Sequence, residues 1–150
     1  MTSTIVVGFD GSTDSHAALR WAAALAQSLG SHLVVVHAVG LLEHLDTHDR
    51  AARERAVAFE VAGSMGVEPE QMEWCALDGD PCSVLLRVTE APGAADMVVV
   101  GTRGMGAHTG SVLGSTSLEL AEHCTVPLVI VPATFSGDRT GPPAGVTKAG

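Results

Sequence analysis

The sequence predicts an α/β protein with a doubly wound, five-stranded parallel sheet and helices on both faces. Short runs of β-branched residues alternate along the chain with alanine-rich segments of helical period. Most of the apolar runs are continuous, which is typical of strands buried on both faces. Because parallel strands need crossover connections, the helices between them are expected to cover both faces of the sheet. The length of 150 residues fits one domain, which we place at residues 1–132.

The first half of the chain predicts two strand–helix pairs, at residues 5–9 and 14–29 and then at 33–39 and about 48–65. The strands are runs of Val, Ile and Leu, and the first ends at an Asp-Gly turn signal. In the first helix, apolar residues recur at helical spacing. Ser12 or Thr13 is available as its N-cap and Gly30 as its C-terminal stop.

The second half predicts strands at residues 72–77, 97–100 and 127–131, with a helix from 81 to about 91. Met72 and Trp74 alternate with Glu73 and Cys75, which is typical of a one-sided edge strand. The helix after it has strong start signals, because an N-cap residue is followed by a proline at the first helical position, at Asp80 and Pro81.

A last helix is expected to begin near Ser115, with its apolar residues at Leu118, Ala121 and Cys124. The chain after the last strand is rich in Gly, Pro and Thr, so residues 133–150 are predicted to form a disordered tail.

The net charge and the length of the apolar stretches indicate which classes of partner this protein does not bind. The formal net charge is −9, with 8 Lys and Arg against 17 Asp and Glu, which leaves little material for a basic nucleic-acid surface. The most apolar stretch, residues 33–42, is interrupted by His37 and too short to cross a bilayer. We therefore expect neither nucleic acid nor a membrane as partner.

Cysteine usage and the N-terminus indicate a cytoplasmic protein. Three cysteines without paired spacing, Cys75, Cys82 and Cys124, do not form a disulfide framework and are expected to pack as small apolar groups. The first residues lack a basic region followed by an apolar stretch, so no signal peptide is predicted. His44 and His48 lie four residues apart without an evident third ligand, so no protein metal site is predicted.

A glycine-dense segment follows the fourth predicted strand and enters a hydroxyl-rich helix start, from Gly101 to Ser117. Glycine allows an anion to approach the backbone closely, and the N–H groups at a helix start favour negative charge. The segment contains no lysine, which excludes a Walker A loop. Gly104 and Gly106 match the first two glycines of the dinucleotide fingerprint, but Gly110 falls one place late for the third. A phosphate-binding loop of another kind is indicated.

The spacing Gly-x2-Gly-x9-Gly-[Ser/Thr], met at Gly101, Gly104, Gly114 and Ser115, resembles that of the universal stress protein family. The resemblance covers about residues 4–132. It includes the opening strand with its Asp-Gly-Ser end, the Gly-Asp-Pro helix start and the closing proline-bounded strand. It implies a Rossmann-like fold of the adenine nucleotide α-hydrolase type that holds ATP, with Mg2+.

The resemblance also implies site residues. Asp10 would lie near the ribose or the metal-phosphate end, with Ala38 and Val100 near the adenine. The nucleotide-binding set that it predicts is Gly8, Phe9, Asp10, Ala38, Val100, Gly101, Arg103, Gly104, Gly114, Ser115 and Thr116. Family members commonly dimerise through their last strands, here Val126–Val131, so a homodimer is expected.

Plainer interpretations stand beside these assignments. Asp10 fits a turn at a strand end, and Arg103 fits a surface charge as well as a ligand contact. His37 inside its strand is expected to be structural, and His108 a solvated loop residue.

The expected function is a nucleotide-dependent stress-response module with at most slow ATP hydrolysis and no assigned catalytic residue. One alternative is a protein of the same fold that binds cyclic AMP, or no nucleotide at all, and serves as a scaffold. Another is an ATP-pyrophosphatase-type adenylating enzyme. That class carries a Ser-Gly-Gly-x-Asp-Ser loop after the first strand, from which residues 8–12 of this chain depart.

Overall fold

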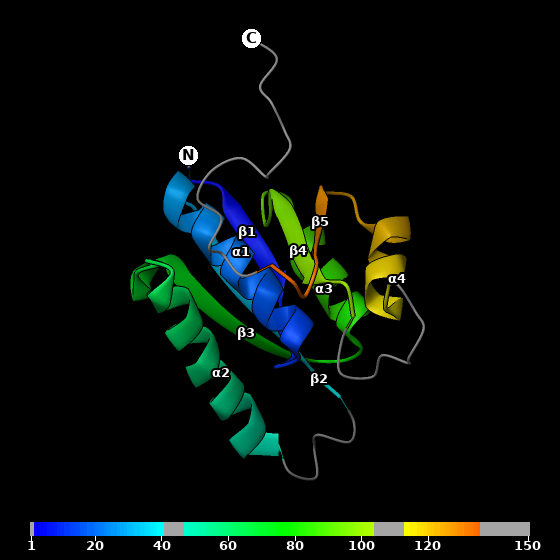
Figure 1. Cartoon of the computed structure of the whole chain (residues 1–150). Helices are drawn as coiled ribbons and strands as arrows, with labels where there is room; N and C mark the ends of the chain where they lie inside the picture. Colours follow the sequence, from blue (N-terminus) through cyan, green and yellow to red (C-terminus); the bar gives the residue numbers. More distant parts are fainter. Residues whose placement is uncertain (1, 41–46, 104–112, 136–150) are drawn as a thin grey trace, which may run out of the picture.

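The computed structural model describes residues 2–40, 47–103 and 113–135 and contains a parallel sheet in the order β3-β2-β1-β4-β5 (Figure 1). Its strands are β1 (Thr4–Gly8), β2 (His32–Val39), β3 (Met72–Asp78), β4 (Met97–Gly101) and β5 (Leu128–Val131). The helices are α1 (Thr13–Leu29), α2 (Thr47–Ser64), α3 (Pro81–Glu90) and α4 (Ser115–His123), with a short 3-10 turn at Pro69–Gln71. The predicted fold class is confirmed.

The predicted start and stop signals act as expected. Ser12 caps α1, because its side chain accepts a hydrogen bond from the Ser15 N–H, and Gly30 ends the helix at φ 65°. Asp80 caps α3 by accepting from the Ser83 N–H at 3.0 Å, ahead of Pro81 at the helix start.

Helices cover both faces of the sheet, α1 and α2 on one side and α3 and α4 on the other (Figure 1). Alternate strand residues supply the two cores. Ile5 and Val7 of β1 pack with the α1 and α2 alanines, while Val6 packs with Val84 of α3 and Leu120 of α4. The low aromatic content is consistent with cores built mainly from Val, Leu, Ile and Ala.

The third predicted strand lies at an edge of the sheet, as its alternating pattern indicated. Its Trp74 ring stacks on the His37 ring, with centroids 5.6 Å apart and planes 18° apart. His37 is completely buried, which agrees with the structural role expected for it.

Of the three apolar residues expected in the last helix, only Cys124 packs against the core under α3 and α4. The buried residues of α4 are Ser117 and Leu120, whereas Leu118 is 51% exposed and Ala121 is also exposed. The side of α4 that faces the sheet instead includes Ser117, whose hydroxyl donates to the Gly101 carbonyl oxygen at 2.9 Å.

The three cysteines are free thiols, with Cys82 buried and Cys75 and Cys124 half-buried. All three contribute to the core under α3 and α4. The described chain continues three residues past the predicted domain end, and Phe135 packs against the core under α1. The rest of the predicted tail, residues 136–150, lies outside the described residues.

Candidate functional site

The strand order reverses between β1 and β4, which lie side by side at the centre of the sheet. From β1 the chain crosses toward β2, and from β4 it crosses toward β5 on the other side. In open parallel sheets, ligands bind outside the carboxyl ends of the strands at this point. The segments that follow Gly8 and Gly101 are therefore the candidate site.

The chain leaving β1 is firmly held. Phe9 is 2% exposed, and its N–H donates to the Val36 carbonyl oxygen at 2.9 Å. Its own carbonyl oxygen lies 2.9 Å from His37 Nδ1. Because a carbonyl oxygen only accepts, His37 carries its proton on Nδ1 in this contact. The buried histidine thus fixes the strand end next to Asp10.

Asp10 forms the turn that an Asp-Gly pair at a strand end predicts. Its Oδ1 accepts from the Ser12 N–H at 2.9 Å, across Gly11 at φ 83°. Its own N–H donates to Ser15 Oγ at 3.3 Å. Asp10 is thus held at the strand end by contacts of both its side chain and its backbone.

Two side chains of α2 lie against the same turn. Arg50 Nη2 donates to the Asp10 carbonyl oxygen at 3.4 Å. A Cβ added at Gly11 would come within 2.5 Å of Glu54 Oε1, the end of a side chain that can turn away, so it is the φ of 83° that favours glycine here. Neither Arg50 nor Glu54 was predicted to belong to the site.

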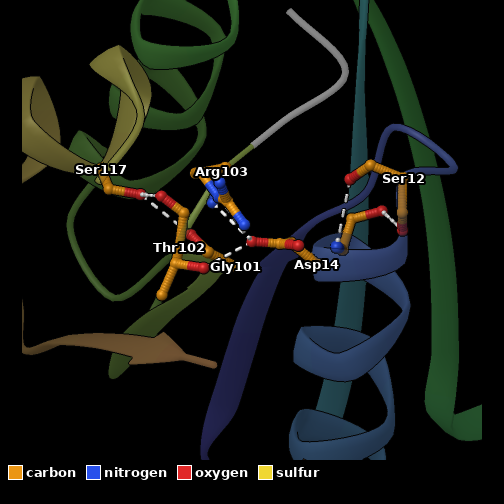
Figure 2. A network of polar contacts seen from close by, with 7 residues as sticks. Ser12, Asp14, Gly101, Thr102, Arg103 and Ser117 are labelled. Carbon is orange, nitrogen blue, oxygen red and sulfur yellow. Dashed lines mark hydrogen bonds and ion pairs between the residues drawn. The ribbon is translucent and has the colours of Figure 1, made fainter. Parts of the chain in front are cut away.

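A network of three residues, here called the Asp14 network, joins α1 to the end of β4: Asp14, Thr102 and Arg103 (Figure 2). Asp14 Oδ2 accepts from the Thr102 hydroxyl and, at 2.8 Å, from the Arg103 N–H. Arg103 Nε lies 4.0 Å from the same oxygen, and the side chains of Arg103 and Asp14 are 42% and 11% exposed. Arg103 is thus paired with a protein carboxylate, while part of its side chain faces solvent.

Gly101 lies where α1 comes closest to β4. A Cβ built at this position would be 2.6 Å from the Asp14 carbonyl carbon and oxygen. Real Cβ atoms do not approach backbone atoms so closely, so the glycine is required by packing between the strand and the helix. The family resemblance implies that Gly101 also lies close to the ligand.

Thr102 also connects the two ends of the glycine-dense segment. Its carbonyl oxygen accepts from the Gly114 N–H at 2.7 Å. The Ser117 hydroxyl adds bonds to the Gly101 and Thr102 carbonyl oxygens, at 2.9 and 3.4 Å (Figure 2). The strand end and the start of α4 are thereby held together. Predicted residue Gly104 lies outside the described residues.

The N-cap residue of α4 is Gly114 at φ −76°, and in the described part of the chain this helix start has no side-chain cap hydrogen bond. Ser115, the first residue of the helix, is exposed and Thr116 is half-buried. An uncapped helix start leaves backbone N–H groups for other acceptors, and the helix dipole favours an anion there.

The predicted adenine-lining residues lie toward the α3 side of the sheet. Val100 is 5% exposed and Ala38 is half-buried, and both pack with the core under α3 and α4. A Cβ at Gly8 would lie 3.2 Å from Leu85 and 3.4 Å from Val100. The structure therefore places Gly8 beside Val100, at the junction of β1 and β4.

Sequence reasoning missed Asp14, Thr102 and Ser117. Asp14 is predicted to lie in the first turn of a helix, where acidic residues are common, so its sequence position gave no sign of a tertiary contact. Among the described residues, no group of three or more His, Cys, Asp or Glu could hold a metal ion. None of the described helices is both long and apolar enough to span a membrane.

Relatives of the chain carry one family name. The model of the universal stress protein family matches residues 1–132. A universal stress protein of Thermus aquaticus is 32% identical over 139 residues, covering 87% of this chain and 99% of that protein. One from Mycolicibacterium smegmatis is 33% identical over 141 residues, covering 85% of this chain and 47% of the relative. This chain thus spans about half the length of several curated relatives that it matches.

Solved structures agree with this fold. A universal stress protein in complex with cAMP superposes with a TM-score of 0.72 at 25% identity, covering 89% of this chain and 98% of that one. A universal stress protein from Lactobacillus plantarum gives a TM-score of 0.74 at 19% identity, covering 86% and 97%. By its sequence match and its fold, the chain belongs to the universal stress protein family.

Proposed function

We propose that this chain binds an adenine nucleotide at the carboxyl edge of its sheet, with Mg2+-ATP as the ligand. The observation that carries the proposal is the glycine pattern of Gly101, Gly104, Gly114 and Ser115, whose described members lie at the β1/β4 switch point. The uncapped start of α4 supports it, because its N–H groups suit a phosphate. The similar structure solved with cAMP supports an adenine nucleotide as the ligand class.

In the proposed site, two separate segments of the chain bind the phosphates and the adenine. Phosphates are assigned to the start of α4, at Gly114, Ser115 and Thr116, and the adenine to the surroundings of Ala38 and Val100. Asp10 offers a carboxylate at the end of β1, and Mg2+ commonly binds through one or two carboxylates together with substrate phosphates. When bound, the ion would neutralise phosphate charge; the protein residues hold and orient the nucleotide.

In this proposal the nucleotide acts as a signal. Occupancy biases the conformation or the partner choice of a stress-response protein, and hydrolysis is slow and incidental. A homodimer through Val126–Val131 is part of the proposal. It is supported by the position of β5 at an edge of the sheet and by the partial exposure of Leu128, Val129 and Ile130. Sedimentation of the native chain, with and without ATP, measures its assembly state.

The test is calorimetric titration of nucleotide-free protein with Mg2+-ATP and, separately, with cAMP. Gly114→Val is expected to weaken ATP binding, because a branched side chain obstructs approach to the helix start. Ser83→Ala is the matched control, since Ser83 lies in the first turn of α3, a helix start that Asp80 already caps. Folding of each variant is verified by its circular dichroism spectrum.

Competition separates the two ligand candidates. Displacement of cAMP by ATP at lower concentration supports the ATP assignment, and the reverse order makes cAMP the ligand. No binding of either nucleotide to the folded native protein would contradict the proposal and leave a nucleotide-free scaffold as the better account.

A further inference from the structure

Asp14 concentrates several contacts on one carboxylate oxygen. Oδ2 accepts from the Thr102 hydroxyl and from the Arg103 N–H, and Arg103 Nε lies 4.0 Å away (Figure 2). Hydrogen bonds to an ionised acceptor are stronger than neutral ones, and partial burial reduces their screening by water. These contacts span 88 and 89 positions of sequence, so they determine how α1 and β4 meet.

Thr102 links Asp14 to the other end of the glycine-dense segment through two hydrogen bonds. Its side chain binds Asp14, while its carbonyl oxygen accepts from the Gly114 N–H at 2.7 Å. Gly114 is the N-cap residue of α4. The Ser117 hydroxyl, in the first turn of that helix, donates to the Gly101 and Thr102 carbonyl oxygens. The start of α4 is therefore located relative to α1 through Thr102.

We propose that Asp14 is a positioning residue for phosphate binding. It acts without touching the nucleotide, by fixing Thr102 and through it the position of the α4 start relative to α1. The inference rests on the proposed function and deepens it, because it separates the phosphates from the adenosine part of the ligand. Adenosine is expected to depend little on Asp14, since it makes no use of the α4 start.

A purely structural role for Asp14 predicts a different result. An acidic residue in the first turn of α1 also stabilises that helix through its dipole. Loss of that effect would lower stability and weaken every ligand to the same extent. A purely structural role therefore predicts no dependence of the affinity loss on the number of phosphates in the ligand.

The experiment compares Asp14→Asn and Thr102→Val with the matched control Asp96→Asn. Asp96 Oδ2 accepts from the Thr4 N–H at 2.8 Å, a similar contact at the opposite edge of the sheet. Affinities for Mg2+-ATP, ADP, AMP and adenosine are measured by calorimetry on each folded variant. Thr102→Val keeps the side-chain volume and removes only the hydroxyl donor, so it tests the same contact should Asp14→Asn fail to fold.

Both test variants are expected to weaken ATP binding by about 10- to 100-fold, by analogy with the loss seen when groups that orient metal ligands are removed. Adenosine affinity should change by less than about twofold, well under 1 kcal/mol. Thr102→Ser, which retains the hydroxyl, and Asp96→Asn should both bind ATP like the native chain. Equal losses for ATP and adenosine, or unchanged ATP affinity, would overturn the inference.

Hydrogen exchange on the nucleotide-free protein tests the network independently. Asp14→Asn should accelerate exchange of the Arg103 and Gly114 amides, and Asp96→Asn should not. Unchanged exchange at both amides would overturn the inference whatever the affinities. If the native protein binds no nucleotide, the proposed function fails and this inference fails with it. If the native protein binds ATP and Asp14→Asn binds it equally well, only the inference is overturned.

Discussion

Replacing Gly101 by alanine should force α1 away from β4. The new Cβ would be 2.6 Å from the carbonyl carbon and oxygen of Asp14 and 2.7 Å from its Cβ. Carbon atoms pack best at about 3.5–4.0 Å, so roughly 1 Å of separation is missing. Two of these three atoms belong to the backbone, so no change of rotamer relieves the contact. The helix start or the strand end has to move.

The cost has two sources. Overpacking of a well-filled region typically costs about 1–3 kcal/mol. Movement of this size also lengthens the hydrogen bonds that Thr102 and Arg103 donate to Asp14, and bonds to charged groups contribute about 1.5–3 kcal/mol. Partial loss of one such bond brings the expected destabilisation to about 3 kcal/mol. For a domain of this size the melting temperature should then fall by about 6–12 °C.

Urea and thermal unfolding of the nucleotide-free protein measure this change, with Gly63→Ala as control. Gly63 lies in α2, and a Cβ there meets no atom within 4 Å. That substitution should be neutral or stabilise the helix by up to about 1 kcal/mol. If Gly101→Ala unfolds within about 0.5 kcal/mol of the native chain, a range ordinary for surface changes, the packing account of Gly101 is refuted.

Two further predictions concern the strand and helix ends. Hydrogen bonding by Ser83, chiefly from its N–H, lowers the pKa of Asp80 below its ordinary 3.8. The ionised Asp80 cap therefore stabilises α3 above pH 3.8, and this stabilisation is lost as the pH falls through the lowered pKa. Asp80→Ala should therefore cost about 1 kcal/mol in urea unfolding at neutral pH, and a cost that does not shrink below pH 3.8 would contradict the account. His37→Leu should lower the unfolding free energy by about 1–3 kcal/mol because it leaves the Phe9 carbonyl oxygen without its histidine donor. Unaltered unfolding of that variant would show the contact to be dispensable.

Local signals predicted most of the fold because they act over a few residues. Continuous apolar runs indicated the strands, and caps such as Ser12 and Asp80 located helix starts that the structure confirms. The burial of α4 could not be predicted in this way. Ser117 in its first turn donates hydrogen bonds to the Gly101 and Thr102 carbonyl oxygens, so Ser117 is buried and the apolar Leu118 is exposed.

The candidate site was located by topology and by the glycine pattern, but the packing requirement at one glycine was not predicted. Gly101 fits the family pattern, and its contact partner Asp14 is far away in the sequence. A single sequence carries no signal that pairs the two positions. The same holds for Arg50 and Glu54, which approach the β1 turn only because α2 packs beside α1.

The hydrogen bonds at the switch point narrow which donors are suited to bind an anion. The Arg103 N–H donates to Asp14, and the Gly114 N–H donates to the Thr102 carbonyl oxygen. A phosphate that used either group would first have to break a bond within the protein. The N–H groups of Ser115 and Thr116 follow Gly114, an N-cap residue that has no side chain to cap the helix, and the dipole at this helix start also favours negative charge. These hydrogen bonds therefore favour the N–H groups of Ser115 and Thr116 within the proposed phosphate position, while Asp14 and Thr102 fix the place of the α4 start.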